Sequence, residues 1–255
     1  MSDSHSAPIS SRLPPSSKSG YGTLHLIPVG LGEAPIDDWL PAHAQAQAGK
    51  LKTYIVENAK VARAFLKLTP LAHPLQDITL HELNARVDEA ALEAWLAPLK
   101  AGQDIGLVSD AGCPAVADPG AHAVALAHRW GVCVKPWVGP SSILLGLMAS
   151  GLDGQRFAFH GYAPVEPVER VKQLKAWEQA SAKQKQTQLL IETPYRNQAM
   201  FASLIEHLKG NTRLCVARSV TTRDEWVRTL TVSQWKNQPI PVLDKHPTLF
   251  LFQAA

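Results

Sequence analysis

A chain of 255 residues with 45% hydrophobic and 18% charged residues has an ordinary globular composition, which excludes a fibrous or wholly disordered protein. The formal net charge of +3 at pH 7 is mild, so charge alone neither requires nor excludes a nucleic-acid partner. Three widely spaced cysteines favour neither a disulfide framework nor a zinc site, and we assign no metal ligands.

The first 20 residues are rich in Ser and Pro and lack the apolar core of a secretory signal, so they are expected to form a disordered tail. No later stretch reaches the ~18 consecutive apolar residues of a membrane span. Together with the unpaired cysteines, this predicts a cytoplasmic protein that is not attached to a membrane.

Five short apolar runs then alternate with segments of helical spacing, and each run is predicted to be a strand. They cover residues 23–30, 51–58, 78–84, 104–110 and 132–138. This alternation predicts an α/β domain, residues 21–153, with a mostly parallel five-stranded sheet covered on both faces. An apolar helix with Ser at its start and Gly at its end, within residues 139–152, is expected to close this domain.

After residue 153 the pattern changes to more closely spaced strands. Strands are predicted at residues 156–164, 187–194, 212–220, 225–235 and 247–253, and helices at 165–185 and 197–209. Closely spaced strands favour antiparallel pairing, so residues 154–255 are expected to form an α+β domain.

Three loops rich in Gly and Pro follow predicted parallel strands: "PVGLGEAP", "SDAGCPAVADPG" and "VGPSS". In an open parallel sheet, ligands bind beyond the carboxyl ends of the strands, where such loops meet. Each loop could instead simply end its strand. The phosphate-binding, zinc-protease and nucleophile-elbow motifs GxxxxGK[ST], GxGxxG, HExxH and GxSxG are all missing from the sequence.

The pair "VSDAGCPAVADPG" and "VGPSSILLGLMASGL" resembles the signature of the tetrapyrrole methylase superfamily, the class III S-adenosylmethionine-dependent methyltransferases. The segments "FAFHGYAP", "LLIETPYR" and "VARSVTTRDEWVRTL" resemble the branch called ribosomal RNA small subunit methyltransferase I, which methylates a ribose 2′-hydroxyl. The resemblance covers residues 24–252. It implies a two-domain fold, S-adenosylmethionine bound between the domains, ribosomal RNA as substrate and a homodimer.

The resemblance also implies which residues bind the methyl donor. They are Pro28, Gly30, Ser109, Asp110, Ala111, Gly112, Pro140, Ser141, Ser142, Tyr162, Glu192, Thr193 and Pro194. Cys113 lies within the same loop and is expected to shape it rather than to act as a nucleophile.

Removing the proton of a ribose hydroxyl needs an acceptor, and Glu57 at a strand end is the candidate general base, with a structural ion pair or a solvated position as the alternative. Arg196, Arg218 and Arg228 are candidates for contacting RNA, or else they belong to an ordinary charged face. The lysines of helix 165–185 are expected to be a solvated face, with an RNA-binding patch as the alternative.

Three departures from the RNA branch leave the substrate open. "GLGEAP" replaces its Gly-Asn-Leu-Gly-Asp stretch, "ENAK" keeps the Glu of Glu-Asp-Thr-Arg but loses the Arg, and the family's Arg-Gly-Thr appears as Arg228-Thr229 without the glycine. A methyltransferase acting on a tetrapyrrole or another small substrate is therefore an alternative, and a non-catalytic binding protein of the same fold is another.

Overall fold

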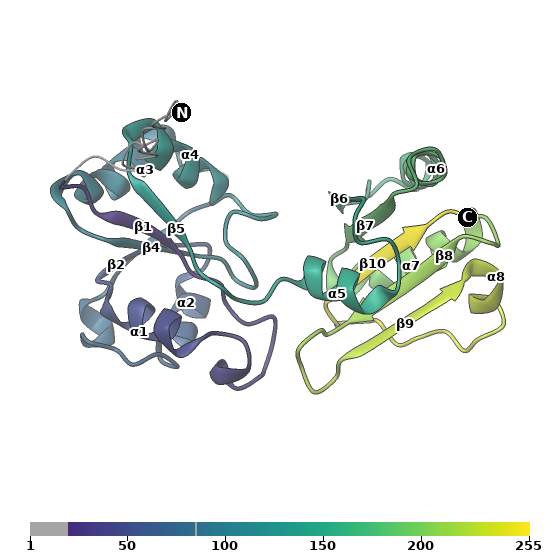
Figure 1. Ribbon diagram of the computed structural model, residues 1–255, viewed down its shortest axis with the longest axis horizontal. Helices are drawn as coiled ribbons and strands as arrows, with labels where there is room; N and C mark the ends of the chain where they lie inside the picture. The colour runs from purple at the N-terminus through teal and green to yellow at the C-terminus, as the bar shows by residue number, and fades with distance from the viewer. Residues whose placement is uncertain (1–19, 85) are drawn as a thin grey trace, which may run out of the picture.

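Two five-stranded sheets, one after the other along the chain, form the framework of the protein (Figure 1). The computed structural model describes residues 20–84 and 86–255, so the expected tail lies outside the described residues except for Gly20. The α/β class with two sheets, predicted from the sequence, is confirmed.

All strand pairs of the first sheet are parallel, in the order β3-β2-β4-β1-β5. Its strands are β1 (Thr23–Leu26), β2 (Thr53–Val56), β3 (Thr79–Glu82), β4 (Ile105–Val108) and β5 (Cys133–Pro136). Each lies within one of the five apolar runs. The central strand, β4, is buried along its whole length, as expected for a sheet covered on both faces.

Helices cover both faces of this sheet. Two apolar clusters lie on its opposite sides, one beneath α1 and α2 and the other beneath α3 and α4. The helices are α1 (Ala42–Lys50), α2 (Ala59–Leu66), α3 (Glu89–Leu96) and α4 (Ala121–Trp130), with short 3-10 turns η1 (Ile36–Asp38), η2 (Leu75–Asp77) and η3 (Ala97–Ala101). The sequence does not predict α1, because its alanines alternate with His and Gln and give no clear apolar face.

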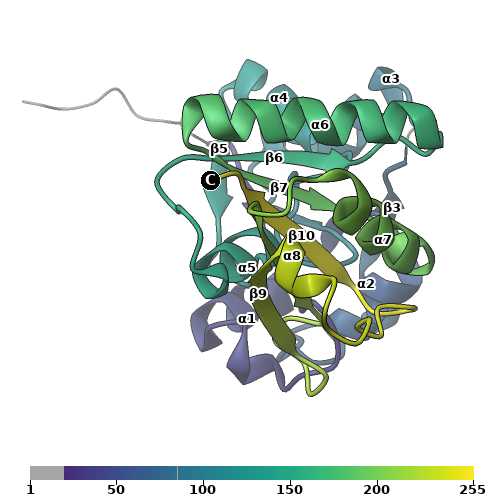
Figure 2. The same ribbon diagram turned by 90° about the vertical axis from the view of Figure 1, so that its right-hand side faces the viewer.

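The second sheet is mixed, in the order β6-β7-β10-β8-β9. Only β6 (Phe157–Tyr162) and β7 (Thr187–Ile191) pair in parallel, whereas β10 (Thr248–Gln253), β8 (Arg213–Arg218) and β9 (Trp226–Thr231) add antiparallel pairs. Helices α6 (Pro167–Gln184) and α7 (Asn197–His207), the latter preceded by the turn η4 (Pro194–Arg196), cover one face of it (Figure 2).

One predicted strand, residues 225–235, is wrong in its second part, which is helical. The segment 225–235 leaves the sheet at Thr231, where α8 (Val232–Trp235) begins. The Thr231 hydroxyl accepts the N–H of Gln234, and the Gln234 side chain accepts the N–H of Thr231. This reciprocal capping box starts a helical turn where apolar alternation alone suggested more strand.

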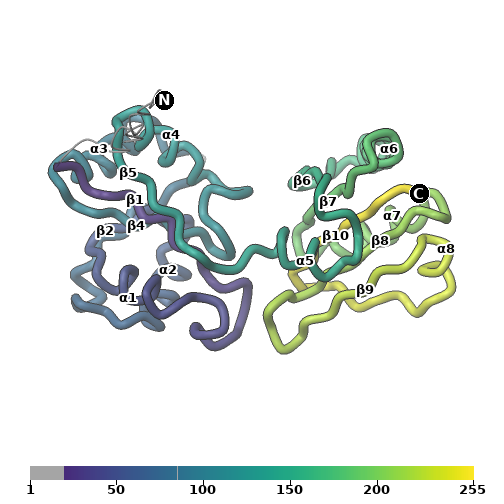
Figure 3. Tube along the Cα trace, viewed as in Figure 1, coloured from purple at the N-terminus to yellow at the C-terminus, as the bar shows by residue number. Residues whose placement is uncertain are grey.

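Helix α5 (Ser142–Ser150) packs against the second sheet, on β8, β9 and β10. An ideal Cβ at Gly146 would lie 2.5 Å from Cδ2 of Leu249, so the missing side chain lets the helix approach the sheet closely. The chain crosses between the two sheets just before this helix (Figure 3). We therefore propose that the domain division lies near residues 137–141, whereas the sequence pattern suggests 153–154.

Candidate functional site

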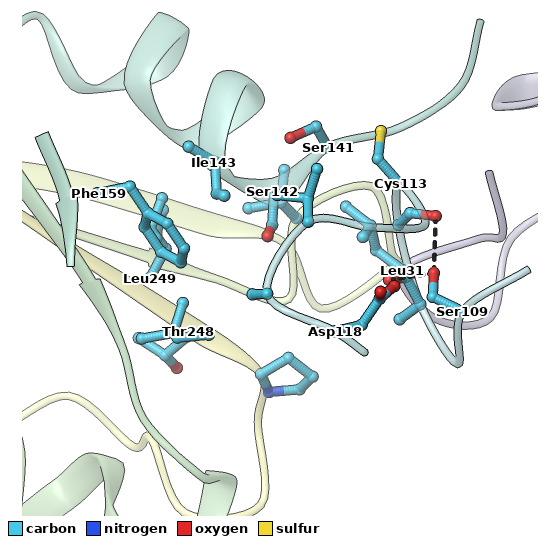
Figure 4. A pocket seen from close by; sticks show the side chains of 18 of the residues that line it. Leu31, Ser109, Cys113, Asp118, Ser141, Ser142, Ile143, Phe159, Thr248 and Leu249 are labelled. Carbon is cyan, nitrogen blue, oxygen red and sulfur yellow. Dashed lines mark hydrogen bonds between the residues drawn. The ribbon is translucent and has the colours of Figure 1, made fainter. Parts of the chain in front are cut away.

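A cavity of about 350 Å³ lies between the two sheets, at the carboxyl ends of the parallel strands of the first. Its walls come from the loops after β1, β2 and β4, from the start of α5, and from the second sheet (Figure 4). Nine of the residues predicted from the sequence line it: Glu57, Ser109, Ala111, Gly112, Ser141, Ser142, Tyr162, Glu192 and Pro194. The volume falls in the range of small-molecule sites, roughly 300–1,000 Å³.

The loop after β4 is fastened to the loop after β1. Gly112 and Val29 exchange two backbone hydrogen bonds, each of 2.9 Å, and Gly112 has φ +75°, which favours glycine. The Ser109 hydroxyl contacts the carbonyl oxygens of Ala111 and Gly112 at 3.2 Å. The Gly112 backbone and the Ser109 hydroxyl thus hold the shape of this wall. Figure 4 shows Ser109 at the cavity.

The same loop continues through two non-glycine residues in the left-handed region, Ala115 at φ 66° and Ala117 at φ 61°. Asp118 holds this conformation, because its carboxylate accepts the N–H groups of Ala115 at 2.9 Å and of Gly120 at 2.7 Å. Such backbone strain persists only where surrounding contacts enforce it, and here the contacts come from Asp118 on the cavity wall. Asp118 is not among the site residues predicted from the sequence.

Glu57 faces the cavity from the end of β2. Its Oε2 accepts the backbone N–H of Asp110 at 2.7 Å, which joins the ends of β2 and β4. Burial raises the pKa of Glu57, the Asp110 N–H opposes that shift, and the nearby charges of Asp118 and Asp110 add to it. Burial likewise raises the pKa of Asp118, against the hydrogen bonds from Gly120 and Ala115.

Among the described residues, neither Glu57 nor Asp118 forms an ion pair with Lys, Arg or His. Two carboxylates that are partly withdrawn from water therefore line one cavity without a cation. Such an arrangement favours a ligand that carries positive charge, because the ligand would supply the missing counter-charge.

Five predicted residues support the wall from behind or beside it and are not among the cavity-lining residues: Pro28, Gly30, Asp110, Pro140 and Thr193. Each has a definite structural neighbour. An ideal Cβ at Gly139 would lie 2.3 Å from Cβ of Pro28, and one at Gly30 would lie 3.1 Å from the Trp39 ring. These positions fix how closely the loops approach one another.

Cys113 also behaves as a wall residue. Its thiol donates a hydrogen bond to the carbonyl oxygen of Pro140 at 3.4 Å, which ties the loop after β4 to the start of α5. Burial raises the pKa of the Cys113 thiol, so the reactive thiolate is disfavoured.

Arg196 is engaged by Glu192 of the cavity wall. Its Nε and Nη2 donate to Oε1 of Glu192 at 3.0 and 2.5 Å, and the N–H of Thr193 donates to the same oxygen at 2.7 Å. The Glu192 side chain is almost fully buried, whereas that of Arg196 is about one-third exposed. The pair therefore shapes the turn before α7.

The other two predicted RNA contacts also have protein partners. Arg218 donates to the carbonyl oxygens of Val242 at 2.8 Å and Asp224 at 3.3 Å. Arg228 donates to Oε1 of Gln238 at 3.1 Å. Neither is a cavity-lining residue, so the structure does not gather the three arginines into one site.

The second sheet supplies an apolar wall that the sequence analysis missed. It includes Phe159 and Leu249, which Figure 4 labels, and Ala217, with the polar Thr248 beside them. Phe159 and Tyr162, three residues apart on β6, would point to opposite faces of a regular strand, but the register shifts between them and Gly161 has φ 66°. The glycine in "FHGY" is the one signal that could have indicated this bulge.

No helix in the part of the chain that the structure describes is long and apolar enough to cross a membrane. Within residues 20–84 and 86–255, no group of three or more His, Cys, Asp or Glu side chains is arranged to hold a metal ion.

Comparison with known proteins gives a consistent result. The family model described as Tetrapyrrole (Corrin/Porphyrin) Methylases matches residues 23–235. Proteins named ribosomal RNA small subunit methyltransferase I are 34% identical over 69% of this chain in Mesorhizobium japonicum and 29% identical over 84% of it in Pseudomonas aeruginosa. These alignments span 57% and 71% of the two relatives.

Solved structures share the fold at low sequence identity. The methyltransferase CobJ is 18% identical, with a TM-score of 0.60 over 93% of this chain and 95% of its own. The cobalt precorrin-4 methyltransferase CbiF is 16% identical, with a TM-score of 0.56 over 95% and 98%.

Proposed function

Since the chain belongs to the tetrapyrrole (corrin/porphyrin) methylase family, we propose that it is an S-adenosylmethionine-dependent methyltransferase acting on a ribose 2′-hydroxyl of small-subunit ribosomal RNA. The names of its curated relatives support this substrate. The observation that carries the proposal is the cavity between the sheets, whose wall holds two carboxylates that form no ion pair with any described residue.

The residues of the cavity fit this methyl donor. S-adenosylmethionine carries a net positive charge, which Glu57 and Asp118 would balance. The apolar wall around Phe159 and Leu249 suits the flat adenine ring. Tyr162 and the turn at Glu192 would close the side of the second sheet, and Ser141 and Ser142 would approach from the start of α5.

When bound, S-adenosylmethionine supplies a methyl group from its sulfonium sulfur, and the rest of the donor then leaves as a neutral thioether. The protein's own task is to align the ribose oxygen with that carbon and to accept the hydroxyl proton. Glu57 is the residue we assign as the acceptor. Its position on the cavity wall and its raised pKa both suit a carboxylate that gains a proton during the reaction.

A cytoplasmic location and a homodimer complete the proposal. Ribosomal RNA as substrate supports the first. The second rests on the resemblance to the family.

Calorimetry with S-adenosylmethionine tests the donor site. The exposed Ala111 lines the cavity, so Ala111→Phe should fill it with little effect on folding. We expect wild type to bind and Ala111→Phe to lose binding, whereas Ala90→Phe, at an exposed position on α3, should bind as wild type does. Failure of wild type to bind, in the presence and absence of ribosomal RNA, would refute the proposal.

Methyl transfer to RNA is a separate measurement. Purified enzyme with labelled donor should transfer label to small-subunit ribosomal RNA and release it as a 2′-O-methylnucleoside on digestion. Transfer to a tetrapyrrole and not to RNA would instead favour the small-molecule alternative.

A further inference from the structure

The exposed face of α2 carries three cations and no acidic residue. Lys60, Arg63 and Lys67, the last at the end of the helix, are all exposed and spaced three and four residues apart, so they share one face. Among the described residues, none of the three forms an ion pair. We refer to these three side chains as the α2 basic face.

The α2 basic face begins at the rim of the cavity. Ala59, the first residue of α2, follows Glu57 by two positions. The start of the helix is fixed, because Asn58 accepts the N–H groups of Lys60 and Val61 and Glu82 accepts the N–H of Ala59. With a rise of about 1.5 Å per residue, Lys60 and Lys67 lie about 10 Å apart along the axis.

We propose that the α2 basic face binds the phosphate backbone of the substrate RNA next to the nucleotide that enters the cavity. This proposal rests on the proposed function and adds where the RNA is held. A row of unpaired cations that leads away from the reaction site can neutralise successive phosphates. Lys and Arg contacts of this kind position a nucleic acid without reading its sequence.

A basic helix can also bind an anionic membrane, but α2 lacks the apolar face that this requires. Ala62, Phe65 and Leu66 point into the core of the first domain and are 2%, 3% and 0% exposed. A helix that lies in a membrane interface inserts its apolar side into the lipid. Since that side is already buried, RNA is the partner that fits the remaining cations.

The arginines predicted from the sequence are less available for this role. Arg196 is held by Glu192, and Arg218 donates to two backbone carbonyl oxygens. Using either for phosphate would give up a bond within the protein. The α2 basic face can bind without that loss.

The test compares wild type with the triple variant Lys60→Gln, Arg63→Gln, Lys67→Gln. Binding of naked small-subunit ribosomal RNA is measured by filter retention over a range of salt concentrations. We expect the variant to bind at least ~10-fold more weakly near 0.15 M salt, and the slope of log affinity against log salt to fall by about two to three. The KM for RNA should rise, with the affinity for S-adenosylmethionine unchanged.

A matched control removes the same charge from another helix. Lys172, Lys175 and Lys183 are exposed on α6, which crosses the top of Figure 2 while α2 lies near the bottom right. Their replacement by Gln should leave the salt slope within about half a unit of wild type. A conservative variant, Lys60→Arg, Arg63→Lys, Lys67→Arg, should bind RNA as wild type does.

The outcomes separate this inference from the proposed function. If wild type binds donor and methylates RNA but the α2 variant matches it in affinity and salt slope, the inference is wrong and the proposed function stands. Equal losses in the α2 and α6 variants would also refute it, since they would show a dependence on net charge alone. Binding of wild type to phosphatidylserine vesicles but not to RNA would favour a membrane surface instead.

Discussion

The backbone N–H of Asp110 donates a 2.7 Å hydrogen bond to Oε2 of Glu57, so one carboxylate both faces the cavity and fastens the ends of β2 and β4. Glu57→Gln, which removes the charge, and Glu57→Ala, which also removes the oxygen atoms, are therefore different experiments. The first tests proton transfer, and the second also releases the loop after β4.

We expect Glu57→Gln, which keeps an acceptor for Asp110 but removes one of the two charges facing the donor, to bind S-adenosylmethionine about 10-fold more weakly, while kcat at saturating donor falls about 100-fold or more. Glu57→Ala should lose still more donor affinity. Calorimetry and single-turnover methylation measure the two effects. An unchanged kcat in Glu57→Gln would remove Glu57 as the general base.

The pH dependence of kcat/KM, which reports the ionisations of the free enzyme, gives a second check on Glu57. The carboxylate is the active form, and burial raises its pKa. Activity should therefore fall as the pH is lowered through a pKa above the ordinary Glu value of about 4.3. Glu57→Gln should lack this acidic limb. Persistence of the limb in the variant would assign it to another group.

Asp118→Asn is expected to stabilise the donor-free protein at neutral pH. A carboxyl whose pKa is raised by burial contributes stability below its unfolded value of about 3.9, and this contribution is lost as the pH rises through the raised pKa. The variant avoids that loss, so its Tm at pH 7 should exceed that of wild type by about 2 °C, with the gain vanishing near pH 4. Thermal unfolding at both pH values measures it.

Saturating S-adenosylmethionine supplies the control for Asp118. A bound cation favours the ionised carboxylate, so the donor should raise the Tm of wild type more than that of Asp118→Asn. A variant less stable than wild type at pH 7 would contradict the prediction. It would show that the bonds to Ala115 and Gly120 need the full charge.

Removal of Arg196 should destabilise the fold. Arg196→Ala leaves the buried Glu192 carboxylate with only the N–H of Thr193, and we expect a loss of about 2–3 kcal/mol, below the full range for buried pairs because Arg196 is partly exposed. Urea unfolding measures it. The double variant Glu192→Gln, Arg196→Ala should recover part of the loss. A loss of the same size in both variants would mean that packing of Arg196, and not its charge, stabilises the turn.

Gly139→Ala tests the contact between two loops. The new Cβ would lie 2.3 Å from Cβ of Pro28, so the loops after β1 and β5 must separate. We expect a loss of about 1–3 kcal/mol of stability and weaker donor binding, measured by unfolding and calorimetry. Gly154→Ala, where no atom lies within 4 Å of the new Cβ, is the control. Equal stability of the two variants would contradict the expected crowding.

The strands were predictable because each is a short apolar run that ends at Gly, Pro or a polar residue. Helix α1 was not, since Ala44 and Ala48 are its only buried aliphatic side chains. The loop with Ser109 and Gly112 was recognisable from its composition. Phe159 and Leu249 were not recognisable as wall residues, because apolar strand residues look alike whether they face a core or a cavity.

The arginines illustrate the limit of sequence patterns for charged residues. In the sequence alone, Arg196 and Lys60 are both basic residues with no indication of an ion-pair partner. The difference between them is that Glu192 pairs with Arg196, whereas no carboxylate in the described part of the chain pairs with Lys60. Only three-dimensional packing distinguishes a cation that holds a turn from one that is available to a partner.

The close packing of α5 against the second sheet has a consequence for protein engineering. Helix α5 begins at the cavity wall, and it packs with the second sheet as one structural unit. Leu249 fills the space that a side chain at residue 146 would occupy. A chimaera that exchanges the second domain between relatives should therefore be joined near residues 137–139. A junction at 153–154 would graft a foreign helix onto the sheet, and the mismatch would occur at the cavity itself.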